Sequence, residues 1–267
     1  MMFSILIAHY NNYEYFTDCY ASILKQSFQD YEIIVVDDCS DDDSYEQIIA
    51  LTSNDPKIKI FRNNGNQGVG YTKRQCVELA AGEICGFVDP DDALAEDALQ
   101  VSVENHNKNN IAAYSSFYMC NDRLMPIKRF KHSRSVQNDN RFFFNIFFEV
   151  NHFFTFKKEA YFETVGINPA LTSAVDQDLY LKLYEKGNFR FINKPLYFYR
   201  LHDKGVSQKT SRKNKLHSNW HKVILDATKR RNIDYLYKQR VDSIANLPEF
   251  LKAKQNNLFA KILRKLA

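Results

Sequence analysis

The segment Ile84-Cys85-Gly86-Phe87-Val88-Asp89-Pro90-Asp91-Asp92 places three carboxylates directly after an apolar run. Residues 84–88 have the near-continuous apolar character of a strand that is buried on both faces. Carboxylates this close together repel one another and lose solvation, so a cation or a cation-bearing ligand must neutralise them. In open α/β sheets, ligands bind at the ends of strands. We therefore expect a divalent metal at the end of this strand.

The residues around this segment alternate between apolar strand-like runs and amphipathic helical spacing. The predicted strands are residues 3–8, 31–36, 58–61, 84–88 and 112–119, and the predicted helices are residues 13–26, 40–51, 71–81 and 96–109. This alternation indicates an α/β fold in which helices cover both faces of a mostly parallel sheet.

The alternation breaks after Asn121. Residues 121–140 are polar and basic and are interpreted as a surface loop. Residues 142–156 are rich in Phe, but the run is too short and too polar to span a bilayer, which favours a buried aromatic cluster. The remaining predictions are a helix at 176–186, strands at 189–192 and 196–200 around a turn at 193–195, and helices from 207 onward.

Composition predicts a single large domain, alone or with an appendage, because the chain has 267 residues of which 45% are hydrophobic. The five cysteines form no CxxC pair, which argues against a zinc knuckle or a redox motif. The residues that follow Met1 lack the pattern of a signal peptide, and we expect a reduced cytoplasmic setting.

Charge is distributed unevenly along the chain. The net charge is +4, yet residues 204–267 contain 16 Lys and Arg against 4 Asp and Glu, while the rest contains 20 against 28. An acidic body with a basic C-terminal end indicates two surfaces with different partners.

Two acidic sites follow strands that a parallel sheet would end on one edge. Their members are Asp37, Asp38, Asp89, Asp91 and Asp92. Oxygen ligands suit a small hard cation, and Mg²⁺ or Mn²⁺ would keep coordination positions open for substrate phosphates. The alternative is that these residues cap helices and turns, which Asp also favours.

A loop at residues 63–70, rich in Gly and Asn, precedes a helix that carries Lys73 and Arg74. Backbone N–H groups and two cations near a helix start would suit a diphosphate. The loop lacks the spacing of a P-loop, so a plain strand–helix connection is an equal alternative.

Four motifs in order resemble glycosyltransferase family 2. They are Ser4-Ile5-Leu6-Ile7-Ala8-His9-Tyr10-Asn11, Ile33-Ile34-Val35-Val36-Asp37-Asp38-Cys39-Ser40-Asp41-Asp42, Asn63 with Asn66-Gln67-Gly68, and Phe87-Val88-Asp89-Pro90-Asp91-Asp92. The resemblance spans about residues 3–207. It implies a GT-A fold, in which a Rossmann-like, mostly parallel sheet is flanked by helices, and an inverting enzyme that uses nucleotide sugars. We expect residues 1–206 to form this domain and residues 207–267 to form a basic helical extension.

Two downstream segments extend the resemblance. Residues 173–183 are similar to the acceptor-side acidic motif, with Val175-Asp176 where members often carry Glu-Asp. The resemblance makes Asp176 the catalytic base, with Asp178 as a structural residue at a helix start. Tyr197-Phe198-Tyr199-Arg200-Leu201-His202 resembles a further motif, in which His202 would complete the metal site or contact the diphosphate.

The resemblance also assigns donor-side roles. Asp38 would contact the uracil or ribose, and the backbone around Ala8 and Tyr10 would help to hold the base. Asp89 would contact the ribose or the metal. Apart from the resemblance, the position of Arg74 after the loop at 63–70 makes it the candidate for the diphosphate. The metal ligand would be Asp91, with Asp92 as the alternative.

Residues 249–267 carry apolar residues at helical spacing with Lys and Arg among them. This pattern fits an amphipathic helix on an anionic membrane, and equally a helix packed on the body or on a second subunit. We expect no nucleic-acid partner, because no recognised nucleic-acid motif accompanies the charge.

The predicted function is a metal-dependent inverting glycosyltransferase that moves a hexose or N-acetylhexosamine from a UDP-sugar to a glycan or lipid-linked acceptor in surface polysaccharide synthesis. It would work in the cytoplasm or on the inner face of the membrane. One rival is a sugar-nucleotide transferase, which needs a Gly-rich basic loop that residues 8–12 lack. The other is a non-catalytic glycan-assembly partner. Val175 favours this alternative, whereas the presence of Asp176, Asp91 and His202 argues against it.

Overall fold

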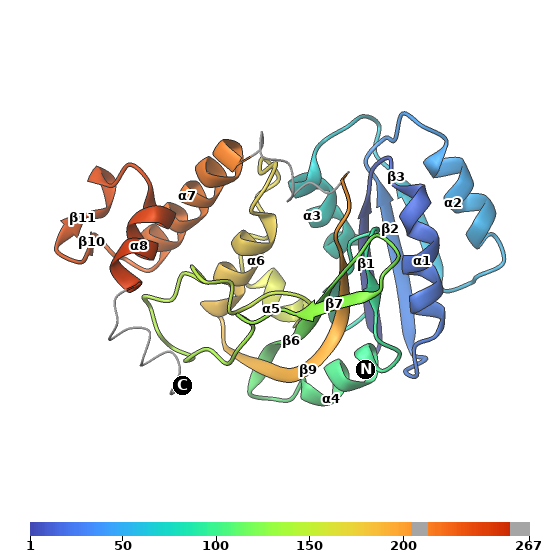
Figure 1. The fold of residues 1–267 in the computed structure, drawn as a ribbon, viewed down its shortest axis with the longest axis horizontal. Coiled ribbons are helices and arrows are strands. Elements are labelled where there is room, and N and C mark those ends of the chain that lie inside the picture. The colour runs from blue at the N-terminus through green and yellow to red at the C-terminus, as the bar shows by residue number, and fades with distance from the viewer. Residues whose placement is uncertain (204–212, 257–267) are drawn as a thin grey trace.

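The computed structural model describes residues 1–203 and 213–256, with the side chains of 213–216 excluded (Figure 1). Its N-terminal half is the predicted alternation of strands and helices. The elements are β1 (Phe3–His9), α1 (Tyr13–Leu24), β2 (Tyr31–Asp37), α2 (Ser44–Thr52), β3 (Ile58–Arg62), α3 (Val69–Leu79) and β4 (Ile84–Phe87). The four strands pair in parallel in the order β3-β2-β1-β4.

The sheet continues beyond β4 with strands that follow it in the chain. These are β8 (Phe154–Lys157), β6 (Asn110–Cys120), β9 (Asn188–Arg200) and β5 (Ala93–Leu94), with β7 (Pro126–Arg129) paired to β6. β8 is antiparallel to both β4 and β6, whereas β6 and β9 are parallel. The helices between these strands are α4 (Ala98–Asn105), α5 (Lys158–Phe162) and α6 (Val175–Tyr184).

Apolar residues alternate between the two faces of the sheet and build a separate core on each. Leu6, Ile34 and Val36 belong to the core that also contains buried residues of α3, α6 and the C-terminal helix α7 (Lys213–Arg230). Ile5, Ile33 and Val35 belong to the core that contains α1 and α4. Successive strand residues point to opposite faces, and helices cover both faces, so strand residues are buried on both sides.

Register brings the ends of β2 and β4 to one edge on either side of β1. His9 pairs with Asp37, and Leu6 pairs with Phe87. Val88 N donates to Leu6 O at 3.0 Å, which carries the pairing up to the acidic segment. The prediction that the two acidic sites share one sheet edge is therefore confirmed.

Several predicted elements differ from the structure. Residues 189–200 form one strand, β9, rather than two strands around a turn; the register against β6 shifts between Ser115 and Ser116, so residues 193–194 are accommodated as a bulge. The predicted loop at 121–140 contains the edge strand β7. α4 ends at Asn105 rather than 109, and α6 starts one residue earlier than predicted.

The C-terminal part contains α7 (Lys213–Arg230), a short hairpin of β10 (Tyr235–Leu236) and β11 (Gln239–Arg240), the 3-10 turn η3 (Val241–Ser243) and α8 (Leu247–Gln255) (Figure 1). The predicted helix from residue 249 thus begins at Leu247 and ends at Gln255, while residues 257–267 lie outside the described residues. Leu247 and Leu251 are fully buried in the core that α7 shares, so this part of the segment packs on the body. No described helix has the length and apolar character needed to cross a membrane.

Candidate active site

Asp37 and Asp38, at the end of β2, turn into the protein. Asp37 Oδ1 lies 3.0 Å from His9 Nδ1, and Asp37 Oδ2 accepts from Ser40 N at 2.9 Å. Burial opposes the charge of Asp37, but the hydrogen bonds from His9 and Ser40 outweigh it and lower the pKa of this carboxyl. Asp37 therefore fixes the turn after β2.

Asp38 organises the loop at residues 63–70. Its Oδ1 accepts from Asn63 Nδ2 and from Gln67 N, each at 2.8 Å, and its Oδ2 accepts from Gly68 N at 2.8 Å. Gly68 has a φ of 88°, a conformation that favours glycine. The nucleoside contact of Asp38 stays a prediction, because both of its oxygens already accept hydrogen bonds from this loop.

Ala8 and Tyr10 lie where β1 ends beside β2. Ala8 pairs with Val36, and Tyr10, which is exposed, places its hydroxyl 3.5 Å from Asp41 Oδ2. Both residues thus border the turn that Asp37 and Asp38 organise. Their predicted contact with the nucleotide base stays a prediction.

Asp92 is buried in the turn that follows β4. It is 1% exposed, and it accepts from Tyr197 Oη and from Arg200 N, each at 2.7 Å. Burial, followed by the charges of Asp91 and Asp89, raises its pKa well above the usual value. Asp92 therefore connects the acidic turn to β9.

Asp91 is more accessible and contacts His202. The side chain of Asp91 is 25% exposed, and its Oδ2 lies 2.8 Å from His202 Nε2. Burial and the charge of Asp89 raise the pKa of Asp91 despite the contact with His202. A cation bound at this turn would neutralise the negative charge of Asp91 and Asp89 that the contact with His202 does not balance.

Arg200 holds the backbone of this turn in place. Its Nε donates to Asp91 O at 2.6 Å, and its Nη2 donates to Asp18 Oδ2 at 2.8 Å. Its guanidinium lies 4.6 Å from the centre of the Tyr15 ring, which in turn lies 4.4 Å from the His202 ring. The acidic turn is thus connected to both α1 and β9.

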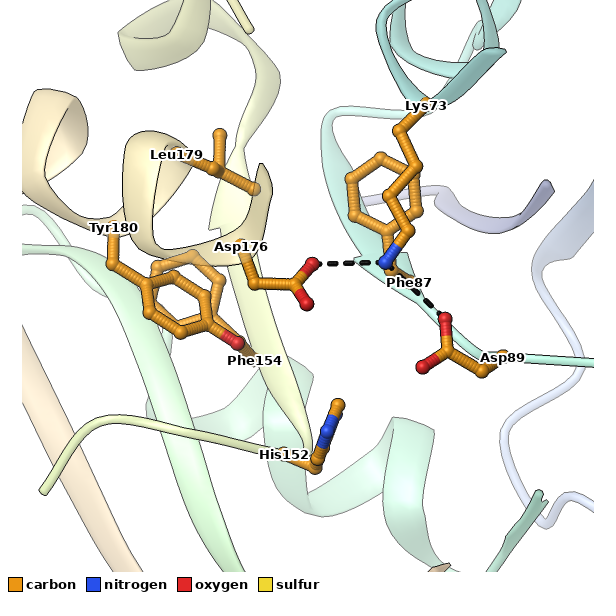
Figure 2. Close-up of a pocket in the computed structure, with 8 residues that line it drawn as sticks. All are labelled: Lys73, Phe87, Asp89, His152, Phe154, Asp176, Leu179 and Tyr180. Atoms are coloured by element: carbon orange, nitrogen blue, oxygen red, sulfur yellow. Dashed lines mark hydrogen bonds and ion pairs between the residues drawn. The ribbon is translucent and has the colours of Figure 1, made fainter. Parts of the chain in front are cut away.

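Lys73 joins Asp89 to Asp176 across the mouth of a pocket (Figure 2). Its Nζ lies 2.8 Å from Asp176 Oδ1 and 3.2 Å from Asp89 Oδ1, and its side chain is 7% exposed. Burial opposes the charge of Lys73, but the two carboxylates outweigh it and raise its pKa. Burial likewise opposes the charge of Asp89, yet Lys73 and then His152 lower its pKa.

The other walls of this pocket are mostly apolar and aromatic. They are formed by Phe87, His152, Phe154, Leu179 and Tyr180. The His152 ring stacks on the Tyr197 ring, with centroids 4.8 Å apart and an interplanar angle of 13°. Asp176, on the first turn of α6, therefore faces Asp89, at the end of β4, from the opposite side of the pocket.

The structure separates the predicted site residues into groups. Asp91 contacts His202, and Lys73 joins Asp89 to Asp176. Asp37 is instead hydrogen-bonded within its own turn, Asp38 to the loop at 63–70, and Asp92 to β9. Within the described residues, no three His, Cys, Asp or Glu side chains form a metal-binding group. The structure thus does not bring the five carboxylates together as one group, and the identity of the metal ligands stays a prediction.

Arg74 lies outside this arrangement. Its Nε donates to Glu78 Oε1 at 2.8 Å, and its Nη1 donates to the carbonyl oxygens of Val165 and Ile167. Lys73 enters the pocket instead. Helical spacing carries the signal for this difference, because Lys73 shares its face of α3 with the buried residues Cys76 and Val77.

Asp178 has the structural role predicted for it. Its Oδ2 accepts from Asn168 N at 2.8 Å and from Lys182 Nζ at 2.7 Å. These contacts connect α6 to the loop that precedes it. His152 is a pocket residue that the sequence did not single out, because a histidine within a Phe-rich run carries no spacing signal of its own.

Comparison with known proteins bears on the family and the fold of this chain. Residues 4–164 match the family model described as Glycosyl transferase family 2. Chondroitin synthase from Escherichia coli is 30% identical over 252 residues, which cover 93% of this chain and 35% of that protein. This chain thus spans about a third of the length of that relative.

Two solved structures share the fold. S. aureus TarS 1-349 in complex with UDP has a TM-score of 0.68 at 20% identity, covering 97% of this chain and 73% of that chain. The mannosyltransferase PcManGT from Pyrobaculum calidifontis in complex with GDP-Man and Mn²⁺ has a TM-score of 0.62 at 13% identity, covering 99% and 78%. The predicted GT-A fold is confirmed, and the family model covers more than half of the chain. This chain belongs to glycosyl transferase family 2.

Proposed function

We propose that this chain is an inverting glycosyltransferase that moves a sugar from a nucleotide sugar, a UDP-sugar, to a hydroxyl of a glycan or lipid-linked acceptor. The observation that carries the proposal is the pocket in which Asp176, on α6, faces Asp89, at the end of β4 (Figure 2). The donor sugar and the acceptor must meet between Asp89 and Asp176, because the transfer joins an oxygen of the acceptor to a carbon of the donor sugar.

The chain's own residues supply the base. Asp176 accepts the proton of the acceptor hydroxyl as that oxygen attacks the anomeric carbon of the donor sugar. The new oxygen–carbon bond forms as the bond between this carbon and the diphosphate breaks, and the bonding pair leaves with the nucleoside diphosphate. One displacement inverts the anomeric configuration, so the chain needs no nucleophile that bonds covalently to the sugar.

The residues at the acidic turn fit a divalent metal, Mn²⁺ or Mg²⁺. Asp91 supplies a carboxylate oxygen beside the imidazole nitrogen of His202, a donor pair that suits Mn²⁺, and diphosphate oxygens and water would complete the shell. A metal held there would neutralise charge on the departing diphosphate. Arg200 and Asp92 would position this pair by fixing the backbone of the turn.

The donor nucleotide is proposed from the comparisons and from the strand edge. TarS was solved with UDP, and the E. coli relative is a chondroitin synthase, which favours a UDP-sugar and a polysaccharide product. The edge formed by Ala8, Tyr10 and Asp38 would receive the nucleoside, with Asp38 acting through the loop it organises. The basic C-terminal residues would meet an anionic membrane on its cytoplasmic face.

The test is nucleoside diphosphate release from a panel of nucleotide sugars with Mn²⁺, with and without acceptor sugars. We expect release from one UDP-sugar, stimulated by the cognate acceptor, and a product of inverted configuration by NMR. No release from any donor would reject the enzyme and favour the rival of a non-catalytic glycan-assembly partner.

A further inference from the structure

Lys73 is a buried cation whose two carboxylate partners come from opposite sides of the pocket. Resting on the proposed function, we infer that Lys73 is a positioning residue for the base: it holds Asp176 Oδ1, so that Asp176 Oδ2 is presented to the acceptor hydroxyl. Lys73 lies on α3, whereas its two carboxylate partners lie elsewhere in the fold. Asp89 follows β4, and Asp176 is on α6. It therefore also fixes the separation between the donor side and the acceptor side.

The orientation of an Asp carboxylate needs such a partner. The terminal torsion of Asp is broad, so the side chain alone does not decide which oxygen faces the pocket. The contact with Lys73 is charge-assisted at 2.8 Å, the class of hydrogen bond that orients a carboxylate most strongly. Asp176 Oδ2 has no hydrogen-bond partner among the residues that the structure describes, and in Figure 2 the carboxylate oxygen that is not bonded to Lys73 points toward His152.

Lys73 also makes it possible for two carboxylates to face one pocket. Without a cation between them, the two carboxylates would repel one another across the pocket. The Nζ of Lys73 lies 5.1 Å from the centre of the Phe87 ring, so its stem is packed while its charge reaches both acids. The side chain is thus held in one place by packing as well as by charge.

A second lysine–aspartate pair on α6 separates positioning from stability. Lys182 is 4% exposed; its Nζ lies 2.7 Å from Asp178 Oδ2 and donates to Gly166 O at 2.8 Å. This pair connects α6 to the loop before it and does not line the pocket. Lys182 is therefore a matched control for the loss of a buried lysine beside an aspartate of the same helix.

The experiment compares Lys73→Met, Lys73→Arg and Lys182→Met in the full chain. For Lys73→Met we expect kcat to fall about 100-fold, the cost of misplacing a reacting group by about 1 Å, while UDP affinity and the acceptor KM change little. Lys73→Arg should recover most of kcat, because guanidinium also bridges two carboxylates. Lys182→Met should lower the Tm and leave kcat close to that of the wild type. A Lys73→Met protein that loses stability and keeps its kcat would overturn the inference.

A second measurement keeps this inference apart from the proposed function. If the wild type transfers no sugar from any donor, the proposed function fails, and crystal structures of the wild type and Lys73→Met decide the positioning role. We expect the Asp176 carboxylate to rotate away from its wild-type orientation once Lys73 is replaced. An unchanged carboxylate in Lys73→Met would show that Lys73 does not orient it.

Discussion

Asp91 Oδ2 lies 2.8 Å from His202 Nε2, although 111 residues separate the two in the chain. The neighbouring Asp92 is turned the other way and is hydrogen-bonded to Tyr197 and Arg200. Two adjacent carboxylates thus have different environments, and the geometry favours Asp91 as the metal ligand.

Replacing Asp91 should therefore affect metal binding more than replacing Asp92. We expect Asp91→Asn to weaken Mn²⁺ binding in the presence of UDP by more than about 100-fold, because it removes a carboxylate ligand rather than an outer contact. Asp92→Asn should act mainly on stability, since its partners belong to the turn and to β9. Titration of Mn²⁺ by electron paramagnetic resonance measures both; a larger loss in Asp92→Asn would reverse the assignment.

Asp176→Asn should separate binding from transfer. The amide keeps the size of the side chain but cannot accept the acceptor proton, so we expect kcat to fall about 10³-fold. UDP affinity should be retained, because Asp176 faces the pocket from the acceptor side. Asp178→Asn is the control on the same helix turn; it should lower the Tm without a comparable loss of kcat. Transfer at the wild-type rate by Asp176→Asn would exclude it as the base.

Gly70→Ala should destabilise the start of α3. A Cβ at this position would lie 2.5 Å from Leu171 O and 2.7 Å from Asn168 O, which are backbone atoms that cannot move aside as a side chain can. We expect this overpacking to lower the free energy of unfolding by about 3 kcal/mol, which urea unfolding would measure. Gly65→Ala is the matched control, since its Cβ would meet nothing nearer than Gln67 Nε2 at 3.9 Å. Equal unfolding free energies for the two variants would contradict the predicted clash.

His106 should make the stability fall as the pH is lowered. Burial, together with the charge of Lys157, lowers its pKa from 6.5 to about 4 in the folded protein. Below about pH 6.5 the unfolded chain binds a proton that the folded chain does not, so stability is full above this pH and declines toward pH 4. The lowered pKa of His106 corresponds to about 3 kcal/mol in the free energy of unfolding. Urea unfolding of His106→Gln should show a shallower decline than the wild type over this window; identical slopes would refute it.

Truncation after Asn256 should weaken binding to anionic membranes. The removed residues include Lys261, Arg264 and Lys265, and each basic side chain near an anionic surface contributes about 1 kcal/mol. We expect about 100-fold weaker partitioning to phosphatidylserine liposomes in sedimentation assays. Neutral phosphatidylcholine liposomes are the control, with little binding by either protein. Unchanged binding to anionic liposomes would favour packing on protein.

Local pattern was sufficient for the first half of the fold. Apolar runs that alternate with amphipathic segments predicted β1 to β4 and α1 to α3, because a strand buried on both faces is a near-continuous apolar run that the sequence displays directly. The same pattern failed at β9, where Pro195 and its neighbours read as a turn. There the pairing with β6 absorbs the irregular residues in a bulge, and pairing with a distant strand is not visible in a local window.

The sequence by itself determined the family, the shared edge of the two acidic sites and the candidate residues Asp176, Asp91 and His202. Tertiary structure alone decided which acids face the pocket. Asp38 is hydrogen-bonded to a loop and Asp92 to a strand. Asp89 and Asp176 both contact Lys73. The physical reason is that residue type and spacing specify which groups end a strand. The direction of each carboxylate depends on partners that lie up to 111 residues away in the chain.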